Sequence, residues 1–110
     1  MQGGDNVIFR ESETVELKEI VVDDIKKEIV AFANSAGGVL YIGVADDGSI
    51  AGVENPDGTT QQIVNMVRDS IKPDITMFLH YETREIEGKQ VIAVEVQRGT
   101  ERPYYLAKKG

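Results

Sequence analysis

The chain has 110 residues, enough for one domain around a single hydrophobic core but too few for two independent domains. Hydrophobic residues make up 41% and charged residues 28%, a composition that excludes disordered and fibrous classes. The formal net charge of -7 argues against strong non-specific binding to phosphate backbones, and the lack of cysteine excludes disulfides and thiolate metal sites.

Apolar runs such as residues 39–44 are far shorter than the roughly 18 residues that a membrane span requires. No basic-then-apolar leader opens the chain, and a protein without cysteine suits a reducing compartment. We therefore expect a cytoplasmic protein that makes no membrane contact.

The first half of the chain predicts a strand, a helix and a second strand. Residues 1–12 are expected to be a partly ordered lead-in to a single domain over residues 13–110. Residues 14–18 alternate in polarity, as in a half-buried strand. A stripe with helical spacing predicts a helix to about Asn34, with Asp23 or Asp24 as its cap. Residues 39–44 read as a strand buried on both faces.

The next segments predict a hairpin, a second helix and a further hairpin. Asp46-Asp47-Gly48 is typical of a tight turn, with residues 50–53 as a short return strand. Thr59 and Gln62 form a capping-box pattern that opens the second helix, and Pro73 ends it. Residues 75–84 and 89–96 predict an antiparallel hairpin joined by residues 85–88. A final short strand is expected within residues 104–107.

This order, β-α-β-β-α-β-β with a final short strand as an option, predicts an α/β (α+β) fold with two helices on one mixed sheet. The sequence stops just past the last predicted strand. We expect a domain truncated at its C-terminus whose partner segment belongs to a longer chain.

Four segments together resemble the Schlafen AlbA-like domain family: ESETVELK (11–18), IVAFANSAGG (29–38), LYIGVADDG (40–48) and IAGV (50–53). Their order and spacing carry the resemblance. Bacterial and archaeal members are described as DNA-binding, transcriptional-regulator-type modules joined to further domains. Some vertebrate relatives cut transfer and ribosomal RNA and pair two such lobes around the substrate. The resemblance therefore implies a nucleic-acid partner, DNA or RNA, and either a homodimer or a multidomain chain.

In the cutting relatives the resemblance assigns catalysis to three carboxylates, which here are Glu11, Glu16 and Asp46, with Asp47 beside it. Carboxylate oxygens hold Mg²⁺ or Mn²⁺, so these residues are also the candidate metal ligands. Glu11 and Glu16 are five residues apart and converge only if the chain bends between them. Asp46 joins them only if strand 14–18 lies beside strand 39–44. The alternative is that Glu11 and Glu13 are solvated surface acids and that Asp46 and Asp47 are turn residues.

Five basic residues, one in the first strand and four near the chain end, are candidates for phosphate contact, because each neutralised phosphate adds salt-dependent affinity. The set is Lys18, Arg98, Arg102, Lys108 and Lys109. Tyr104 and Tyr105 either stack on bases beside Arg102 or pack in the core. Asn34 is expected to cap or bridge the end of the first helix.

Three functions remain open. The first is a nucleic-acid-binding, DNA-binding or regulatory module. The second is a metal-dependent endoribonuclease that uses the three carboxylates. The third is a protein-interaction or dimerisation domain, which the acidic composition suits better than it suits DNA binding.

Overall fold

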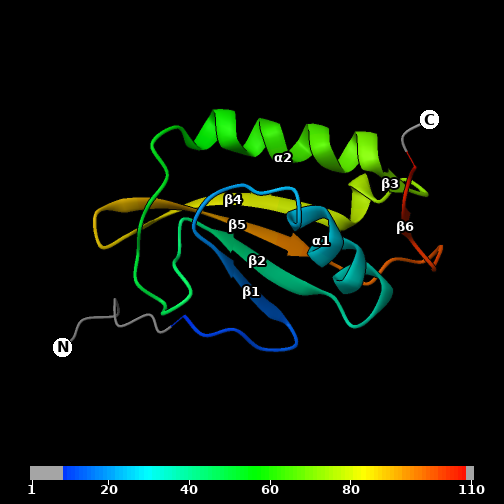
Figure 1. The fold of residues 1–110 in the computed structure, drawn as a ribbon, viewed down its shortest axis with the longest axis horizontal. Coiled ribbons are helices and arrows are strands. Elements are labelled where there is room, and N and C mark those ends of the chain that lie inside the picture. The colour runs from blue at the N-terminus through cyan, green and yellow to red at the C-terminus, as the bar shows by residue number, and fades with distance from the viewer. Residues whose placement is uncertain (1–8, 109–110) are drawn as a thin grey trace.

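A computed structural model describes residues 9–108 as a four-stranded mixed sheet with two helices (Figure 1). The strand order is β1-β2-β5-β4, and the strands are β1 (Val15–Lys18), β2 (Gly38–Ile42), β5 (Lys89–Val96) and β4 (Leu79–Ile86). β1 and β2 run parallel, whereas β5 is antiparallel to both β2 and β4. The predicted fold class is confirmed.

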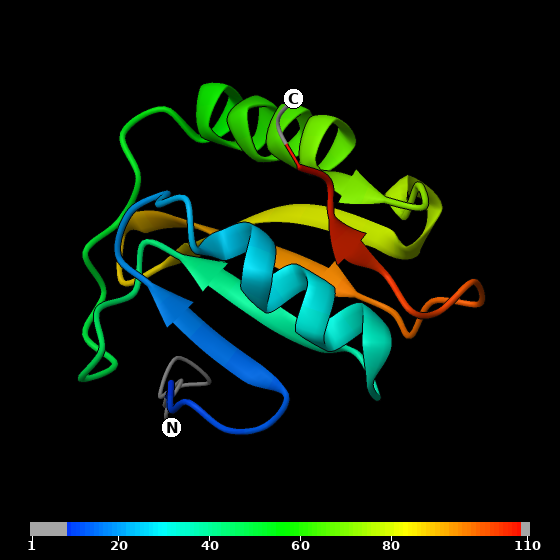
Figure 2. The same ribbon diagram turned by 45° about the vertical axis from the view of Figure 1, so that its right-hand side comes forward.

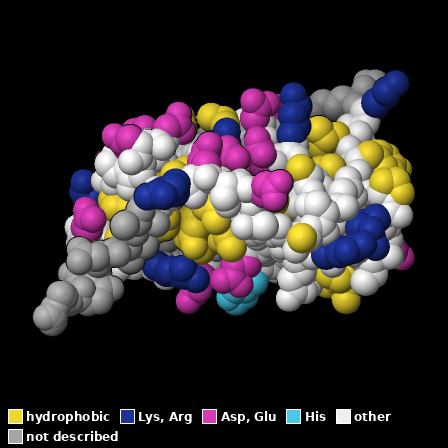
Figure 3. Space-filling view, turned by 90° about the horizontal axis from the view of Figure 1, so that it is seen from below, with side chains coloured by type: hydrophobic (Ala, Val, Ile, Leu, Met, Phe, Trp, Pro, Cys, Tyr) yellow, Lys and Arg dark blue, Asp and Glu magenta, His cyan; other side chains and the backbone are white. Residues whose placement is uncertain are grey.

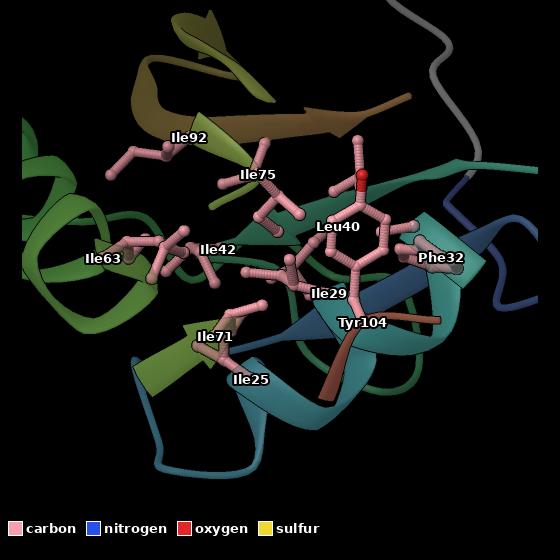
Figure 4. Close-up of a cluster of buried hydrophobic side chains, with 14 residues drawn as sticks. Ile25, Ile29, Phe32, Leu40, Ile42, Ile63, Ile71, Ile75, Ile92 and Tyr104 are labelled. Atoms are coloured by element: carbon pink, nitrogen blue, oxygen red, sulfur yellow. The ribbon is translucent and has the colours of Figure 1, made fainter. Parts of the chain in front are cut away.

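Helices α1 (Ile25–Asn34) and α2 (Pro56–Ser70) cover the same face of the sheet (Figures 1 and 2). The apolar positions of α1 recur at helical spacing, so Ile25 and Ile29 reach the sheet together. Leu40 and Ile42 alternate with less buried residues along β2 and point at the helices. These side chains, with Ile63 of α2, meet in one core that also contains the ring of Tyr104 (Figure 4).

A smaller cluster of buried side chains lies on the opposite face of the sheet. It consists of Phe9, Leu17, Val44, Ile50 and Val91. The ring of Phe9 meets Tyr41 edge-on, with centroids 4.8 Å apart. The expected lead-in over residues 1–12 therefore includes a packed residue at position 9, while residues 1–8 lie outside the described part.

The predicted return strand at residues 50–53 is wrong. Ile50 forms a single bridge with Val44, and Ala51 and Gly52 donate their backbone N–H groups to the carbonyl of Gly43 at 2.8 and 2.9 Å. β2 lies between β1 and β5, so neither of its edges is free for a returning strand. Gly43, at φ 102°, turns the chain away from the sheet instead.

The predicted capping side chains are wrong in both helices. Asp24 occupies the N-cap position of α1, but its side chain makes no capping hydrogen bond. The carboxylates of Asp23 and Asp24 instead pair with Lys26 and Lys27 at 3.0 and 3.5 Å. At the second helix, the side chain of Asn55 accepts from the N–H of Gly58, and Pro56 is the first helical residue. α2 thus begins three residues before Thr59, because proline is well suited to the first helical position.

The end of α2 and the segments after it also differ from the prediction. α2 ends at Ser70, before Pro73, and β3 (Ile71–Lys72) pairs with β6 (Tyr105–Leu106) in a separate two-stranded sheet. The final short strand is therefore confirmed. The 3₁₀ helix η1 (Thr76–Phe78) delays the start of β4 to Leu79.

β4 extends to Ile86 and turns tightly through Glu87 and Gly88, at φ 54° and 76°.

The prediction that β2 is buried on both faces is wrong, since Val39 and Tyr41 stay partly exposed on the face that carries no helix. No helix within residues 9–108 is long and apolar enough to cross a membrane.

Candidate functional site

Glu11 and Glu16 lie side by side at the outer edge of β1. The chain folds back between them, because Ser12 and Val15 exchange backbone hydrogen bonds at 3.0 and 3.4 Å. This hairpin brings Oε2 of Glu11 within 3.3 Å of the N–H of Leu17, which donates to it. Glu11 and Glu16 were expected to converge only if the chain bends between them, and the structure contains this bend.

The environment of Glu16 disfavours its charged form. Its side chain is 20% exposed and lies near Glu28 of α1 as well as Glu11. Partial burial, then repulsion from Glu28 and Glu11, raises the pKa of Glu16, and Lys18 at 3.6 Å opposes the change. Grouped carboxylates of this kind are typical both of functional sites and of surface ion-pair networks.

Asp46 is placed beyond the end of β1, although β1 and β2 are neighbours as the site hypothesis required. Glu16 lies opposite Leu40, and the N–H of Val44 already bonds to the carbonyl of Lys18, the last residue of β1. Asp46 follows in the exposed turn. Beside it, Asp47 accepts from the N–H and hydroxyl of Ser49 at 2.9 and 2.6 Å, which lowers its pKa.

Glu11, Glu16 and Asp46 do not form a complete site for Mg²⁺ or Mn²⁺. Within residues 9–108, no group of three or more Asp, Glu, His or Cys side chains is placed to hold a metal ion. Glu11 and Glu16 offer oxygen donors that a divalent cation accepts, but Asp46 does not complete the set. The residues as placed therefore do not fit the metal site of the cutting relatives.

A second candidate region is the arginine loop, residues 97–104 between β5 and β6, which carries Arg98 and Arg102 in exposed positions. Its backbone is held from several sides. Gln97 N–H donates to Phe78 O at 2.8 Å, and Gly99 N–H donates to Ala33 O at 2.9 Å. The Nε atom of Arg102 donates to the carbonyl of Gly99 at 2.9 Å, which leaves the outer end of its guanidinium group in solvent.

The two tyrosines that follow the arginine loop have different roles. Tyr104 is 2% exposed, its ring belongs to the main core, and its hydroxyl accepts from the N–H of Glu101 at 3.0 Å. Tyr105 is 57% exposed beside the loop. Of the pair proposed for base stacking, Tyr104 is excluded by its burial and Tyr105 keeps an open ring.

The predicted cations do not form one edge. Lys18 lies opposite Ile42 at one end of β2, whereas the arginine loop leaves β5 at Val96, opposite Gly38 at the other end. Lys108 is exposed after β6, and Lys109 lies outside the described residues. Figure 3 shows Lys and Arg side chains as separate spots among acidic ones on the face it presents.

A groove of about 450 Å³ lies between the segment after β1 and the start of α2. Ile20, Val21 and Val53 line it, and Glu19 and Glu54 add acidic groups. Sequence reasoning missed this groove because its walls come from segments that meet only in the folded chain. The one signal in the sequence was Ile20, an apolar residue outside the predicted helices and strands, which the structure leaves exposed.

Comparisons with known proteins place the fold in a family. The family model described as Schlafen, AlbA_2 matches residues 11–110, and no curated protein matches the chain. One similar solved structure is the N-terminal domain of a Nitrosomonas europaea protein named as related to the ATP-dependent DNA helicase RecG. Its TM-score is 0.74 at 21% identity, covering 91% of this chain and 74% of that one.

Another similar structure is the DIP2311 protein from Corynebacterium diphtheriae, with a TM-score of 0.60 at 21% identity. The match covers 84% of this chain but only 19% of that protein. At this identity both likenesses show the fold alone. The family model, in contrast, spans nearly the whole chain, and the chain belongs to the Schlafen, AlbA_2 family.

Proposed function

We propose that the chain is a nucleic-acid-binding module that contacts phosphates through the arginine loop. The observation that supports this most is the placement of Arg98 and Arg102 on a loop whose backbone is fixed before any ligand arrives. A pre-ordered loop loses little conformational entropy on binding. Guanidinium groups bind phosphate oxygens in a planar, two-pronged geometry, which suits this purpose.

Tyr105 gives the same region a surface for a base. Its exposed ring follows the loop directly, and stacking on an aromatic ring stabilises single-stranded nucleic acid without requiring a particular sequence. Glu101 is the one acidic residue within the loop. The site is thus locally basic within a chain of net charge -7, so we expect modest affinity that falls as salt rises.

Membership of the Schlafen, AlbA_2 family supports the same proposal, because the resemblance of this chain to that family implies a DNA or RNA partner. The name of the Nitrosomonas protein relates that protein to a DNA helicase. Roles in transcriptional regulation and in RNA recognition remain part of this proposal, with the present chain acting within a longer protein or in a homodimer.

The experiment is a fluorescence anisotropy titration with labelled single-stranded DNA, single-stranded RNA and duplex DNA at two salt concentrations. We expect Arg98→Ala to weaken binding by about threefold to tenfold and to lower the salt slope by about one. The matched control is Lys27→Ala, which removes an exposed positive charge from the first turn of α1, whereas the arginine loop contacts the last turn of this helix. No binding by the unmodified chain at either salt concentration would refute the function. Equal losses for Arg98→Ala and the control would refute the interface.

Metal-dependent cleavage of RNA is the second candidate function. The contact between Glu11 and Glu16 favours it, because these are two of the three carboxylates that the family resemblance assigns. The position of Asp46 counts against it. Transfer RNA incubated with the protein and Mn²⁺, then with a Glu16→Gln variant, decides the matter: equal cleavage by both proteins, or by neither, removes the enzyme hypothesis.

A further inference from the structure

β4 is a long edge strand that lacks most of the usual features that prevent edge pairing, although it carries the charged residues Glu82, Arg84 and Glu85. It has eight residues, pairs with β5 in unbroken register from Leu79 to Ile86, and contains neither lysine nor proline. Natural edge strands are commonly shortened, bulged or protected by lysine and proline, because free backbone groups recruit another strand. Within residues 9–108, no strand pairs with the outer side of β4.

The opposite edge of the sheet is built differently. β1 has four residues, and the preceding segment turns back beside it so that the carboxylate of Glu11 accepts the N–H of Leu17. One edge is thus short and covered, and the other is long and open. The contrast identifies β4 as the surface that suits a further strand.

Two hydrogen bonds fix which backbone groups of β4 face outward. The carbonyl of Phe78 accepts from Gln97 N–H at 2.8 Å, and the carbonyl of Gln90 accepts from Val53 N–H at 2.8 Å, on the side away from β4. Antiparallel pairs alternate between bonded and non-bonded partners, so the even-numbered residues of β4 bond to β5. The odd-numbered residues, which include Tyr81, Thr83 and Glu85, therefore direct their N–H and C=O groups to the open edge.

Antiparallel pairing of two copies about a two-fold axis at Thr83 matches these outward groups. The backbone of Thr83 then hydrogen-bonds to Thr83 of the second copy, and the backbone of Tyr81 hydrogen-bonds to Glu85 of the second copy. On the face without helices, Glu82 lies opposite Arg84 of the second copy, and the same pair repeats across the axis. Opposite charges at such close, non-bonded cross-strand positions attract, and threonine pairs are also favourable.

A neighbouring register is unfavourable. If the two-fold axis passed through Glu82, the carboxylate of Glu82 would lie opposite Glu82 of the second copy. His80 would then lie opposite Arg84 of the second copy. Like charges directly across a strand pair are destabilising. The sequence of β4 is therefore complementary to itself in the Thr83 register.

Arg84 and Thr83 at the centre of β4 are accessible for this pairing. Arg84 contacts Glu82 at 3.0 Å and Glu95 at 3.4 Å through Nη2, and its side chain is still 39% exposed. Helix α2 packs through Ile63 and Val67 into the main core, which β5 also helps to form, and Thr83 of β4 is exposed.

From this geometry we infer that two copies of the chain associate through β4, forming one continuous sheet centred on Thr83. The inference is independent of the nucleic-acid proposal. It commits to a second copy because the charge pattern matches itself. Binding of an unrelated strand would not require Glu82 and Arg84 to be matched in this way.

The test is sedimentation equilibrium over roughly 1 to 500 µM protein, a range that covers weak dimers. The unmodified chain should approach twice its 12.1 kDa mass. Glu82→Arg alone places two arginines against two arginines, and Arg84→Glu alone places two glutamates against two glutamates. Each should weaken association at least about tenfold.

The decisive result is complementation. A mixture of the Glu82→Arg and Arg84→Glu chains should form a heterodimer, and the double variant should dimerise like the unmodified chain. Glu13→Arg and Lys27→Glu make the same charge changes on exposed residues away from β4 and should leave association unchanged. Circular dichroism confirms that each variant is folded. A single-chain mass for the unmodified protein at every concentration, or no heterodimer from the mixture, overturns the proposal.

Discussion

Asn34 and Tyr104 exchange two hydrogen bonds across 70 residues of sequence. The amide Nδ2 of Asn34 donates to the carbonyl of Tyr104 at 3.0 Å, and the N–H of Tyr104 donates to Oδ1 of Asn34 at 2.7 Å. One side chain thus satisfies both backbone groups of a buried residue. The pair attaches the end of α1 to the arginine loop.

Replacement of Asn34 by alanine should destabilise the fold by about 2 to 3 kcal/mol, because two buried backbone groups lose their partners. Urea denaturation followed by circular dichroism measures the change. Asn65→Ala is the matched control, since Asn65 makes an exposed helix-surface bond with Gln61. We expect the control to change the free energy of unfolding by about 0.5 kcal/mol or less. Equal effects would contradict the bridging role.

Gly99→Ala should also destabilise the arginine loop. A Cβ atom at Gly99 would overlap the ring of Tyr104, which is packed in the core and cannot move freely. Overpacking of this kind costs about 1 to 3 kcal/mol. In a Tyr104→Leu background the same substitution should cost less, because the ring is gone. A thermal-melt double-mutant cycle measures the difference, and an additive cycle would contradict the steric explanation.

Tyr104→Phe should cost about 1 kcal/mol, because the N–H of Glu101 loses its bond to the tyrosine hydroxyl while the ring stays in the core. Tyr105→Phe removes a hydroxyl from an exposed ring and should be nearly neutral. Chemical denaturation of both variants checks the contrast. A larger effect at position 105 would show that the two rings have been assigned the wrong roles.

Glu16→Gln should stabilise the fold at neutral pH. The folded protein raises the pKa of Glu16 above its ordinary value of 4.5, so the ionised form is less favourable folded than unfolded. The destabilisation develops as pH rises from the unfolded pKa to the higher folded pKa, and it is complete above the latter. The stability gained by Glu16→Gln should therefore be largest near pH 7 and vanish below about pH 4.5.

Unfolding curves of the unmodified chain and Glu16→Gln at several pH values measure this dependence. Glu13→Gln serves as the control, because Glu13 is exposed in the same hairpin. A gain for Glu16→Gln that persists unchanged at acidic pH would contradict the electrostatic cause.

Local patterns correctly predicted α1, β1, β5 and the last short strand. The stripe that includes Ile25 and Ile29, and the alternation of Val15 and Leu17, are periodic signals that do not depend on distant residues. The predictions that failed depended on distant neighbours. Residues 50–53 could have formed a strand only at a free edge of β2, and β5 (Lys89–Val96), which comes much later in the chain, occupies that edge.

The candidate site shows the same division. The residue types in the sequence identified Glu11, Glu16, Arg98 and Arg102 as chemically suitable, but their spacing could not reveal the hairpin at Ser12. Nor could it reveal that Tyr104 turns into the core while Tyr105 turns outward, because both positions share the same local pattern.

The sequence by itself determined the fold class, the helix faces and the family, since these follow from short-range periodicity and from ordered motifs. Only the tertiary structure decided that two acids meet while Asp46 does not complete a metal-binding group with them, that Lys18 lies apart from the arginine loop, and that β4 is left open. Such relationships arise because strand order places residues that are distant along the chain side by side, and strand order is set by the packing of the whole sheet.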